Sequence, residues 1–341
     1  MLDAPGTRHA RSWPFRATKG RMRHSPMHRR LLDSGITLLG MLASLVWGVM
    51  GPIHTLSMRL RWKRFRMYQF KARPDDVFIV TYPKSGTTWM QMIVWQLKSG
   101  GSLDFRHIED VVPFLDRCGA ADLPRLEALE SPRFFKSHLP YEDVPRGGRY
   151  IYVVRNLKDV AVSYYHHYLL MEDFKGGLNV FVKMLVTRRT NGGSWARHVL
   201  SWLEHRNDPN VLFLSYDEMQ ADLPGTLRRV ARFSGLTLDE ALMPLLVEQC
   251  GVAFMKRLEA RFDPRLSRRG NFVRKGETGD GLRELDAKLQ ADVLCEEQRV
   301  FDRARELDAS GALERLLRGE VLSSHDASKE ATHEKLRKLP S

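Results

Sequence analysis

The stretch TYPKSGTTW at residues 81–89 decides how this chain folds. It follows the apolar run VFIV at residues 77–80, which is typical of a buried strand, and it leads into an amphipathic pattern that predicts a helix. Gly86 permits a tight turn between the two elements, and backbone amides at the start of a helix attract anions. Lys84 adds a positive charge at this turn. The stretch therefore predicts a phosphate-binding loop.

The spacing of this loop differs from that of the common ATP-binding loop. A Walker A motif has four residues between its glycines and a lysine after the second glycine, whereas Lys84 here precedes Gly86. Taken alone, the motif leaves open a turn that binds nothing and a P-loop kinase of small molecules. The kinase would transfer phosphate from ATP and would require magnesium.

A second strand-to-helix junction occurs in IYVVRNLKDVAVSYY at residues 151–165. Arg155 lies where the strand pattern becomes a helix pattern, and Ser163 follows about two helical turns, or roughly 12 Å, farther on. The two side chains reach one ligand only if Arg155 points back along the helix or the helix begins late. Arg155 alone also fits a surface salt bridge with Asp159, four residues later.

A third segment, FVRKGETGD at residues 272–280, places two adjacent cations in a loop bounded by glycines. Such a loop can fold over a second phosphate. The same residue types are common in solvent-exposed turns that bind nothing.

In this order, the three segments resemble the cytosolic-type sulfotransferase family, which transfers a sulfuryl group from 3'-phosphoadenosine 5'-phosphosulfate (PAPS) to an acceptor. The resemblance covers residues 68–302 and includes KSHLP at 136–140 and VLFLSYDEM at 211–219. It implies the P-loop-like sulfotransferase fold, PAPS as the sulfuryl donor, and no required metal.

The resemblance also implies a role for each residue of the cofactor site. The 5'-phosphosulfate would be held by the first segment, through Lys84, Ser85, Gly86, Thr87, Thr88 and Trp89. The 3'-phosphate would be bound by the second and third segments, through Arg155, Ser163, Arg274, Lys275 and Gly276. Trp89 and Tyr216 would also help to hold the adenine, and the other cofactor contacts would come from Cys250, Met255 and Phe272.

Three residues are expected to take part in the chemistry, namely His138, Lys84 and Lys136. His138 matches the family's general base, and an imidazole with a pKa near 6.5 can accept the proton that an acceptor hydroxyl or amine must lose. Lys84 would lie near the oxygen that becomes the leaving group. Lys136, two residues before His138, would project to the same side of an extended segment and stabilise developing charge. The sequence has no dense carboxylate or Cys/His cluster that indicates a metal.

The chain departs from the family pattern at two places. Gly281 stands where the family usually has tryptophan, which predicts a looser loop over the cofactor, and Cys250 begins a run that replaces threonine, serine and phenylalanine. If these changes prevent the cofactor site from supporting catalysis, the alternative is a catalytically silent, membrane-associated nucleotide-binding protein. The family's dimer motif is not legible after Gly281, so a homodimer stays open.

The alternation of elements predicts one α/β domain over residues 67–317. Its fold class is a three-layer α/β/α domain with a mostly parallel central sheet. The expected strands are 77–82, 133–137, 150–154 and 211–215. The expected helices are 87–99, 157–171, 195–206 and 222–235.

The formal net charge of +13 is concentrated at one end of the chain. Residues 1–73 hold 15 Lys/Arg and two Asp/Glu, so the other 39 Lys/Arg and 39 Asp/Glu cancel. Because the basic excess is a terminal arm without a nucleic-acid-binding motif, no nucleic-acid partner is predicted. We therefore expect residues 1–33 to be a basic, disordered arm and residues 318–341 to be a polar tail.

Residues 34–58 contain no Asp, Glu, Lys or Arg. These 25 residues exceed the roughly 20 apolar residues that cross a bilayer. They predict a single-pass membrane anchor with the catalytic domain in the cytoplasm. A hydrophobic helix packed on a soluble cytoplasmic domain, or lying in the membrane interface, is the alternative.

Candidates for an acceptor pocket are apolar side chains at Phe114, Tyr141, Phe174, Phe181 and Met184. A pocket of this kind accepts a small molecule such as a phenol, alcohol, steroid or amine. The same residue types are also common in an ordinary core.

Overall fold

The computed structural model describes residues 62–171, 174–262 and 272–320. The predicted basic arm 1–33 and membrane anchor 34–58 lie outside these ranges, as does most of the polar tail. Among the helices of the described residues, none is long and apolar enough to span a membrane.

The centre of the domain is a parallel sheet of four strands in the order β2-β1-β3-β4. The strands are β1 (Val77–Thr81), β2 (Phe134–Ser137), β3 (Arg149–Val154) and β4 (Val211–Ser215). Each lies where the sequence predicts it. In the register, Ile79 of β1 lies opposite Lys136 of β2 and Ile151 of β3.

Helices surround this sheet, and those predicted at 87–99, 157–171, 195–206 and 222–235 are present with small shifts at their ends. The α-helices are α2 (Thr87–Ser99), α3 (Ile108–Val111), α4 (Leu123–Glu127), α5 (Leu157–Met171), α6 (Leu178–Val186), α7 (Trp195–Leu203), α8 (Tyr216–Ala221), α9 (Leu223–Ser234), α10 (Met243–Gln249), α11 (Val252–Arg257), α12 (Asp280–Glu284), α13 (Ala287–Leu307) and α14 (Ala312–Arg318). Shorter helical turns are η1 (Phe65–Gln69), η2 (Leu115–Arg117), η3 (Ala120–Asp122), η4 (Tyr141–Asp143), η5 (Glu240–Leu242) and η6 (Glu259–Arg261).

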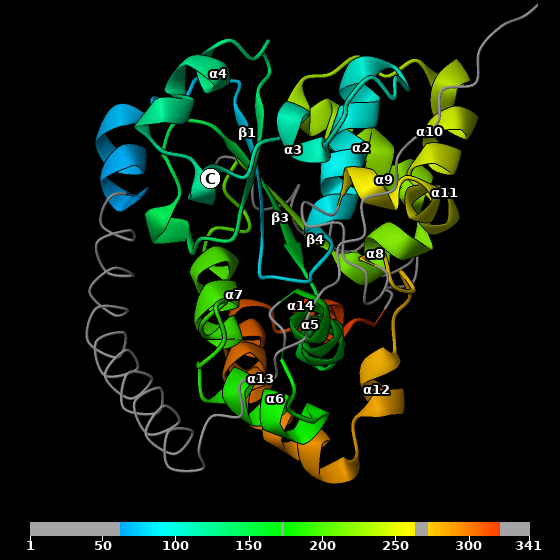
Figure 1. Cartoon of the computed structure of the whole chain (residues 1–341). Helices are drawn as coiled ribbons and strands as arrows, with labels where there is room; N and C mark the ends of the chain where they lie inside the picture. Colours follow the sequence, from blue (N-terminus) through cyan, green and yellow to red (C-terminus); the bar gives the residue numbers. More distant parts are fainter. Residues whose placement is uncertain (1–61, 172–173, 263–271, 321–341) are drawn as a thin grey trace, which may run out of the picture. The chain divides into compact units, whose positions relative to one another are not determined.

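The strands are buried on both faces, which explains why they read as continuous apolar runs. Phe78 and Val80 of β1 point into a core shared with α5, α6, α7, α13 and α14. Val77 and Ile79 point into a second core shared with α2, α9, α10 and α11. Figure 1 shows these two groups of helices on opposite sides of the sheet. The predicted three-layer architecture is confirmed.

The strand order places a topological switch point beside β1, the position at which open parallel sheets form a crevice. The chain leaves β1 for β2 on one side and returns to β3 on the other, so the connections diverge beside β1. In open parallel sheets, ligands bind outside the carboxyl ends of the strands at such a switch point. The carboxyl ends of β1, β2, β3 and β4 lead directly to the segments that contain Lys84, His138, Arg155 and Tyr216, respectively.

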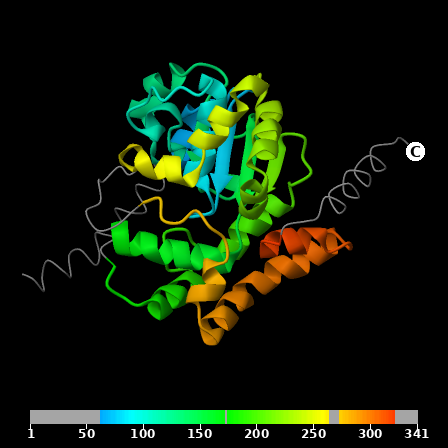
Figure 2. The same cartoon turned by 90° about the vertical axis from the view of Figure 1, so that its right-hand side faces the viewer.

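A late segment of the chain joins the two helical layers at this crevice. In Figure 2 the orange loop before α12 passes from the yellow helices of one layer to the green helices of the other. On one side, the Gln220 amide nitrogen of α8 donates to the carbonyl oxygen of Gly276 at 3.0 Å. On the other side, α12 packs against α5. The loop therefore lies across the carboxyl edge of the sheet.

Candidate active site

The phosphate-loop candidate is a turn between β1 and α2. Lys84 and Gly86 both adopt left-handed backbone conformations, with φ of 70° and 97°. A Cβ atom on Gly86 would lie 2.8 Å from the ring of Tyr216, so this position favours glycine for its conformation and for its close contact. The first turn of α2, which contains Thr87 and Thr88, directs its backbone amides toward the same turn.

Hydroxyl groups line this turn. The hydroxyls of Thr81 and Thr87 are hydrogen-bonded at 2.6 Å. The Ser85 hydroxyl is buried and has no hydrogen-bond partner within the described residues. Since a buried polar group without a partner is costly, an anion in the turn would supply the acceptor that Ser85 lacks. The residues of the loop thus fit the 5' end of a phosphorylated ligand.

Lys84 is surrounded by other cations. Burial is the main cause that lowers its pKa to about 8, and the charges of Arg155, Lys136 and Arg274 lower it further. Its amino nitrogen lies 5.1 Å from the centre of the Phe272 ring. Clustered and desolvated positive charges are stabilised when an anion binds among them.

His138 follows β2 and is held by a hydrogen bond to β1. Its Nδ1 atom lies 2.8 Å from the carbonyl oxygen of Thr81, which can only accept, so Nδ1 carries the proton. The lone pair is consequently on Nε2. Burial, followed by the charge of Lys136, lowers the pKa of His138 well below its ordinary value, although the bond to Thr81 opposes this change. His138 is therefore neutral near pH 7 and able to accept a proton.

A carboxylate that the sequence did not single out anchors the His138 segment. Asp116 of η2 accepts the backbone N–H of His138 at 2.7 Å and the hydroxyl of Ser137 at 2.8 Å. Burial raises the pKa of Asp116, while these two hydrogen bonds lower it. The signal was absent from the local sequence because Asp116 is 22 residues from His138.

Lys136 and His138 both lie against the ring of Phe114. The Phe114 ring is 4.3 Å from the Lys136 nitrogen and 5.1 Å from the His138 ring, measured from its centre. Lys136 also forms an ion pair of 3.0 Å with Glu109 of α3, which the sequence did not identify. Glu109 therefore holds the lysine in place and neutralises part of its charge.

Arg155 joins the first and third segments. Its guanidinium donates to the carbonyl oxygen of Lys84 at 3.4 Å and to that of Glu277 at 2.7 Å. It also lies 4.2 Å from the ring centre of Tyr216. The predicted salt bridge with Asp159 is present at 3.6 Å, but both side chains are buried, so it is not a surface pair. Ser163 is partly exposed on α5, and its convergence with Arg155 stays a prediction.

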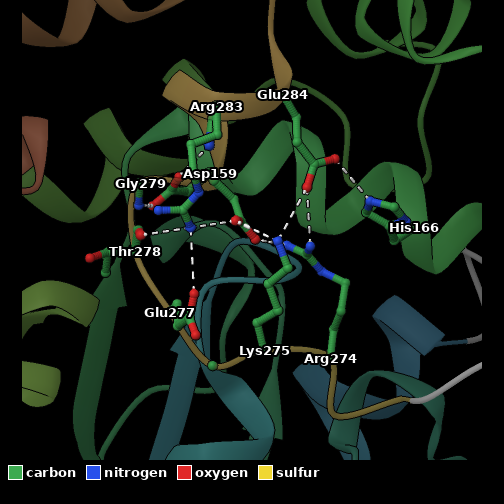
Figure 3. Close-up of polar contacts among 12 residues, drawn as sticks. Asp159, His166, Arg274, Lys275, Glu277, Thr278, Gly279, Arg283 and Glu284 are labelled. Atoms are coloured by element: carbon green, nitrogen blue, oxygen red, sulfur yellow. Dashed lines mark hydrogen bonds and ion pairs between the residues drawn. The ribbon is translucent and has the colours of Figure 1, made fainter.

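The cations of the third segment are paired with carboxylates (Figure 3). Arg274 contacts Asp280 and, at 3.3 Å, Glu284. Lys275 contacts Asp280 at 3.0 Å and Glu284 at 3.7 Å. Burial opposes ionisation of Asp280, but hydrogen bonds from Arg283 and Lys275 and the charge of Arg274 lower its pKa to about 2. Neither carboxylate was identified from the sequence.

The residues that the resemblance assigns to the adenosine part of the cofactor lie close to one another beside α2. The Trp89 and Tyr216 rings are edge to face, with their centres 5.3 Å apart. Cys250 takes part through its backbone, because its carbonyl oxygen accepts the Trp89 indole N–H at 2.9 Å. The Cys250 thiol is buried in the core beside α2, and burial raises its pKa to about 12. Met255 is buried in the same core.

The predicted acceptor-pocket residues separate into two groups. Phe114 lies against His138. The other four, Tyr141, Phe174, Phe181 and Met184, pack against the core on the α5 face, and Phe181 is fully buried there. This distribution leaves Phe114 as the member of the set placed beside the predicted base. Within the described part of the chain, no three His, Cys, Asp or Glu side chains are grouped to hold a metal ion.

Comparison with known proteins agrees with this geometry. The luciferin sulfotransferase of Photinus pyralis is 32% identical over 260 residues, covering 64% of this chain and 70% of that protein. Sulfotransferase 4A1 of Homo sapiens is 38% identical over 200 residues, covering 56% and 70%. The structure of mouse sulfotransferase SULT7A1 complexed with PAP superposes with a TM-score of 0.61 and 26% identity, covering 76% of this chain and 95% of that one. A family model described as "Sulfotransferase domain" matches residues 74–301, more than half of the chain, which therefore belongs to the sulfotransferase family.

Proposed function

We propose that this enzyme transfers the sulfuryl group of PAPS to a hydroxyl or amine of a small acceptor, with His138 as the general base. The observation that carries the proposal is the 2.8 Å contact between His138 Nδ1 and the carbonyl oxygen of Thr81, from which we infer that Nδ1 carries the proton and Nε2 the lone pair. Relatives whose names specify luciferin and amine sulfotransferases support a small-molecule acceptor.

The residues around the loop fit the donor. Lys84, Ser85 and the first turn of α2 would hold its 5'-phosphosulfate, and Trp89 and Tyr216 would flank its adenine. Arg155, Ser163, Arg274 and the rest of the third segment would bind its 3'-phosphate. When bound, PAPS supplies an activated sulfuryl group and a phosphate leaving group.

The side chains of the crevice divide the chemical work between them. His138 Nε2 takes the proton from the acceptor, and its low pKa keeps it in the neutral form that this step requires. Lys84 stabilises the negative charge that develops on the leaving oxygen. Lys136, held by Glu109, stabilises charge on the transferring group from the side of β2.

Sulfuryl transfer from labelled PAPS to a panel of phenols, alcohols and amines tests this proposal. We expect His138→Ala to lower kcat by about 10²–10⁴-fold, the usual contribution of a general base. We expect Lys84→Ala to lower turnover as well. Unchanged turnover in the histidine variant would mean that another group takes the proton, and unchanged turnover in the lysine variant would remove Lys84 from the donor site.

Calorimetric binding separates this function from the kinase alternative, which the family match does not favour. We expect the full-length chain to bind adenosine 3',5'-bisphosphate (PAP) in preference to ADP, and Arg274→Ala to lose that preference. Equal binding of PAP and ADP would revive the kinase. Binding of PAP without turnover on any acceptor would favour the catalytically silent alternative.

We also infer that residues 34–58 anchor the enzyme to a membrane, with the catalytic domain on the cytoplasmic side. The support is their length and lack of charge. The thiols of Cys118, Cys250 and Cys295 are free, which suits a reducing compartment. We expect the full-length chain to resist carbonate extraction from membranes and a chain without residues 34–58 to become extractable. A shortened chain that still resists extraction would refute the anchor.

A further inference from the structure

Asp159 occupies the point where α5 meets the third segment. It lies in the first turn of α5, and its side chain is 2% exposed. One carboxylate oxygen accepts the backbone N–H of Gly281 at 2.7 Å, and the other accepts that of Gly279 at 2.9 Å. Figure 3 shows Asp159 next to Gly279 of the loop. Two charge-assisted hydrogen bonds thus fasten the end of the loop to α5.

The absence of a side chain at Gly281 makes this approach feasible. A Cβ atom there would lie 2.5 Å from the carbonyl carbon of Lys158 and 2.8 Å from the backbone nitrogen of Asp159. Contacts this short require the backbone of the loop or of the helix to move. The glycine that predicted a looser loop is therefore the residue that lets the loop pack directly on α5.

Asp159 also contacts the other half of the proposed 3'-phosphate site. Its carboxylate lies 3.6 Å from the Arg155 guanidinium. Arg155 in turn donates to the carbonyl oxygen of Glu277 at 2.7 Å, in the same loop. Asn156 completes this arrangement, because its amide nitrogen donates to Asp159 at 3.2 Å and its amide oxygen accepts the Asp159 N–H at 2.9 Å.

The two cations proposed to bind the 3'-phosphate lie in the loop just before the glycines that Asp159 binds. Arg274 and Lys275 precede Gly279 by five and four residues, and both reach Asp280, which lies between the two glycines that Asp159 binds. A displacement of the 279–281 backbone would therefore move Asp280 and, through it, both cations. Asp159 contacts neither cation directly in this set of bonds, so its influence on them passes through the loop backbone.

We infer that Asp159 is a positioning residue that sets the enzyme's discrimination for the 3'-phosphate of its nucleotide. It does so by fixing the 279–281 backbone and the Arg155 guanidinium in one arrangement. The inference rests on the proposed function, because it requires that the second and third segments bind the 3'-phosphate. It adds a residue that touches no ligand but determines where the phosphate-binding cations stand.

Calorimetry on the full-length chain tests this role by comparing PAP with AMP, which lacks the 3'-phosphate. In Asp159→Asn, an amide group replaces one acceptor, so an N–H would face a backbone N–H. We expect the ratio of the AMP and PAP dissociation constants to fall by about tenfold or more, with the affinity for AMP nearly unchanged. A general loss of structure would weaken both ligands together.

Gly281→Ala provides a second variant that leaves every charged group in place. The added methyl group should push the loop away from Asp159, and we expect the same selective loss of PAP affinity. Asp308→Asn is the matched control, because Asp308 also accepts two backbone amides, from Ser310 at 3.0 Å and from Leu313 at 2.8 Å, but between α13 and α14. We expect this control to keep the wild-type ratio.

The outcomes separate failure of the inference from failure of the proposed function. If the wild-type chain binds PAP and AMP equally, the 3'-phosphate site itself is wrong. If the wild type prefers PAP but Asp159→Asn and Gly281→Ala keep that preference, Asp159 has no positioning role. Loss of both ligands in equal measure, or loss of the preference in Asp308→Asn, would also overturn the inference. Thermal melting of each variant identifies any that does not fold, and the other site variant then decides.

Discussion

At the scale of single residues, the electrostatics of the proposed base depend on its neighbours on β2 and η2. The Nδ1 atom of His138 is hydrogen-bonded to Thr81 of β1, its backbone N–H is bound by Asp116, and Lys136 is the charge that lowers its pKa most. Burial and the lysine both disfavour the imidazolium form. The pKa of His138 thus depends on Lys136, and through it on the ion pair with Glu109.

This dependence predicts the pH profile of a Lys136 variant. For the wild type, kcat/KM should fall on the acid side of a pH well below 6.5, since His138 must be neutral to accept a proton. Lys136→Met removes a positive charge and leaves Glu109 negative, and both changes favour imidazolium. We expect the acid limb of the kcat/KM profile to move to higher pH, together with a lower plateau.

A lysine far from the crevice supplies the control for this profile. Lys183 is exposed on α6, so Lys183→Met should leave both the limb and the plateau where they are. An acid limb that does not move in Lys136→Met would show that His138 is not the group whose ionisation controls the reaction.

At the scale of elements, two carboxylates of α12 form ion pairs with Arg274 and Lys275, the cations proposed to bind the 3'-phosphate. Asp280 is buried and Glu284 is partly exposed. A phosphate could therefore replace Glu284 as the partner of these cations more readily than it could replace Asp280. Glu284 contacts Arg274, Lys275 and, at 3.1 Å, His166 of α5. Under the proposed function, Glu284 would compete with the 3'-phosphate for Arg274 and Lys275.

Removing this competitor should strengthen nucleotide binding. Glu284→Gln keeps the shape of the side chain but removes its charge, so Arg274 and Lys275 lose an attraction that bound phosphate must overcome. We expect PAP to bind several-fold more tightly, with the affinity for AMP unchanged, when both are measured by calorimetry at low ionic strength. Weaker binding of PAP would show that Glu284 instead orients the two cations.

Glu314→Gln is the matched control for this experiment. Glu314 also contacts two arginines, Arg305 and Arg318, both at distances under 3 Å, but in the α13–α14 region. We expect its substitution to leave the affinity for PAP unchanged. A similar gain in this control would indicate a general effect of net charge.

At the scale of the whole molecule, a buried ion pair between Arg133 and Asp76 joins the starts of β2 and β1. Lys84 follows the end of β1, and His138 follows the end of β2. Arg133 donates to both oxygens of Asp76, at 2.7 Å and 2.6 Å, and both side chains are fully buried. Arg133 also donates to the carbonyl oxygens of Leu126 and Lys71. The pair therefore ties β1, β2 and their preceding segments into one unit.

Breaking this pair should destabilise the fold. Arg133→Met leaves Asp76 buried without its partner, and such a change costs about 3–5 kcal/mol of unfolding free energy. Urea unfolding followed by circular dichroism measures the loss. Arg228→Met is the control, because Arg228 makes a similar two-bond pair with Glu240 on the exposed surface, where we expect little change. Equal effects of the two substitutions would contradict this account.

Sequence reasoning predicted those members of the candidate site that directly follow strand ends. Lys84, His138, Arg155 and Tyr216 each come just after a short apolar run, and parallel strands bring their carboxyl ends to one edge. It did not locate Asp116, Glu109, Asp159 or Glu284 as members of the site. Carboxylates are common on helices and turns, and nothing in their local sequence distinguishes a surface carboxylate from one that the fold buries against a cation.

The sequence by itself determined the α/β class, the order of the strands along the chain and the family, because these depend on short-range periodicity and local turn chemistry. Only the tertiary structure decided which partner each charged side chain meets. For example, the backbone nitrogen of Gly281 lies 2.7 Å from a carboxylate oxygen of Asp159, although 122 positions separate the two residues in the sequence. Contacts of this kind depend on how the helical layers pack on the sheet, and the periodicity of the sequence does not specify that packing.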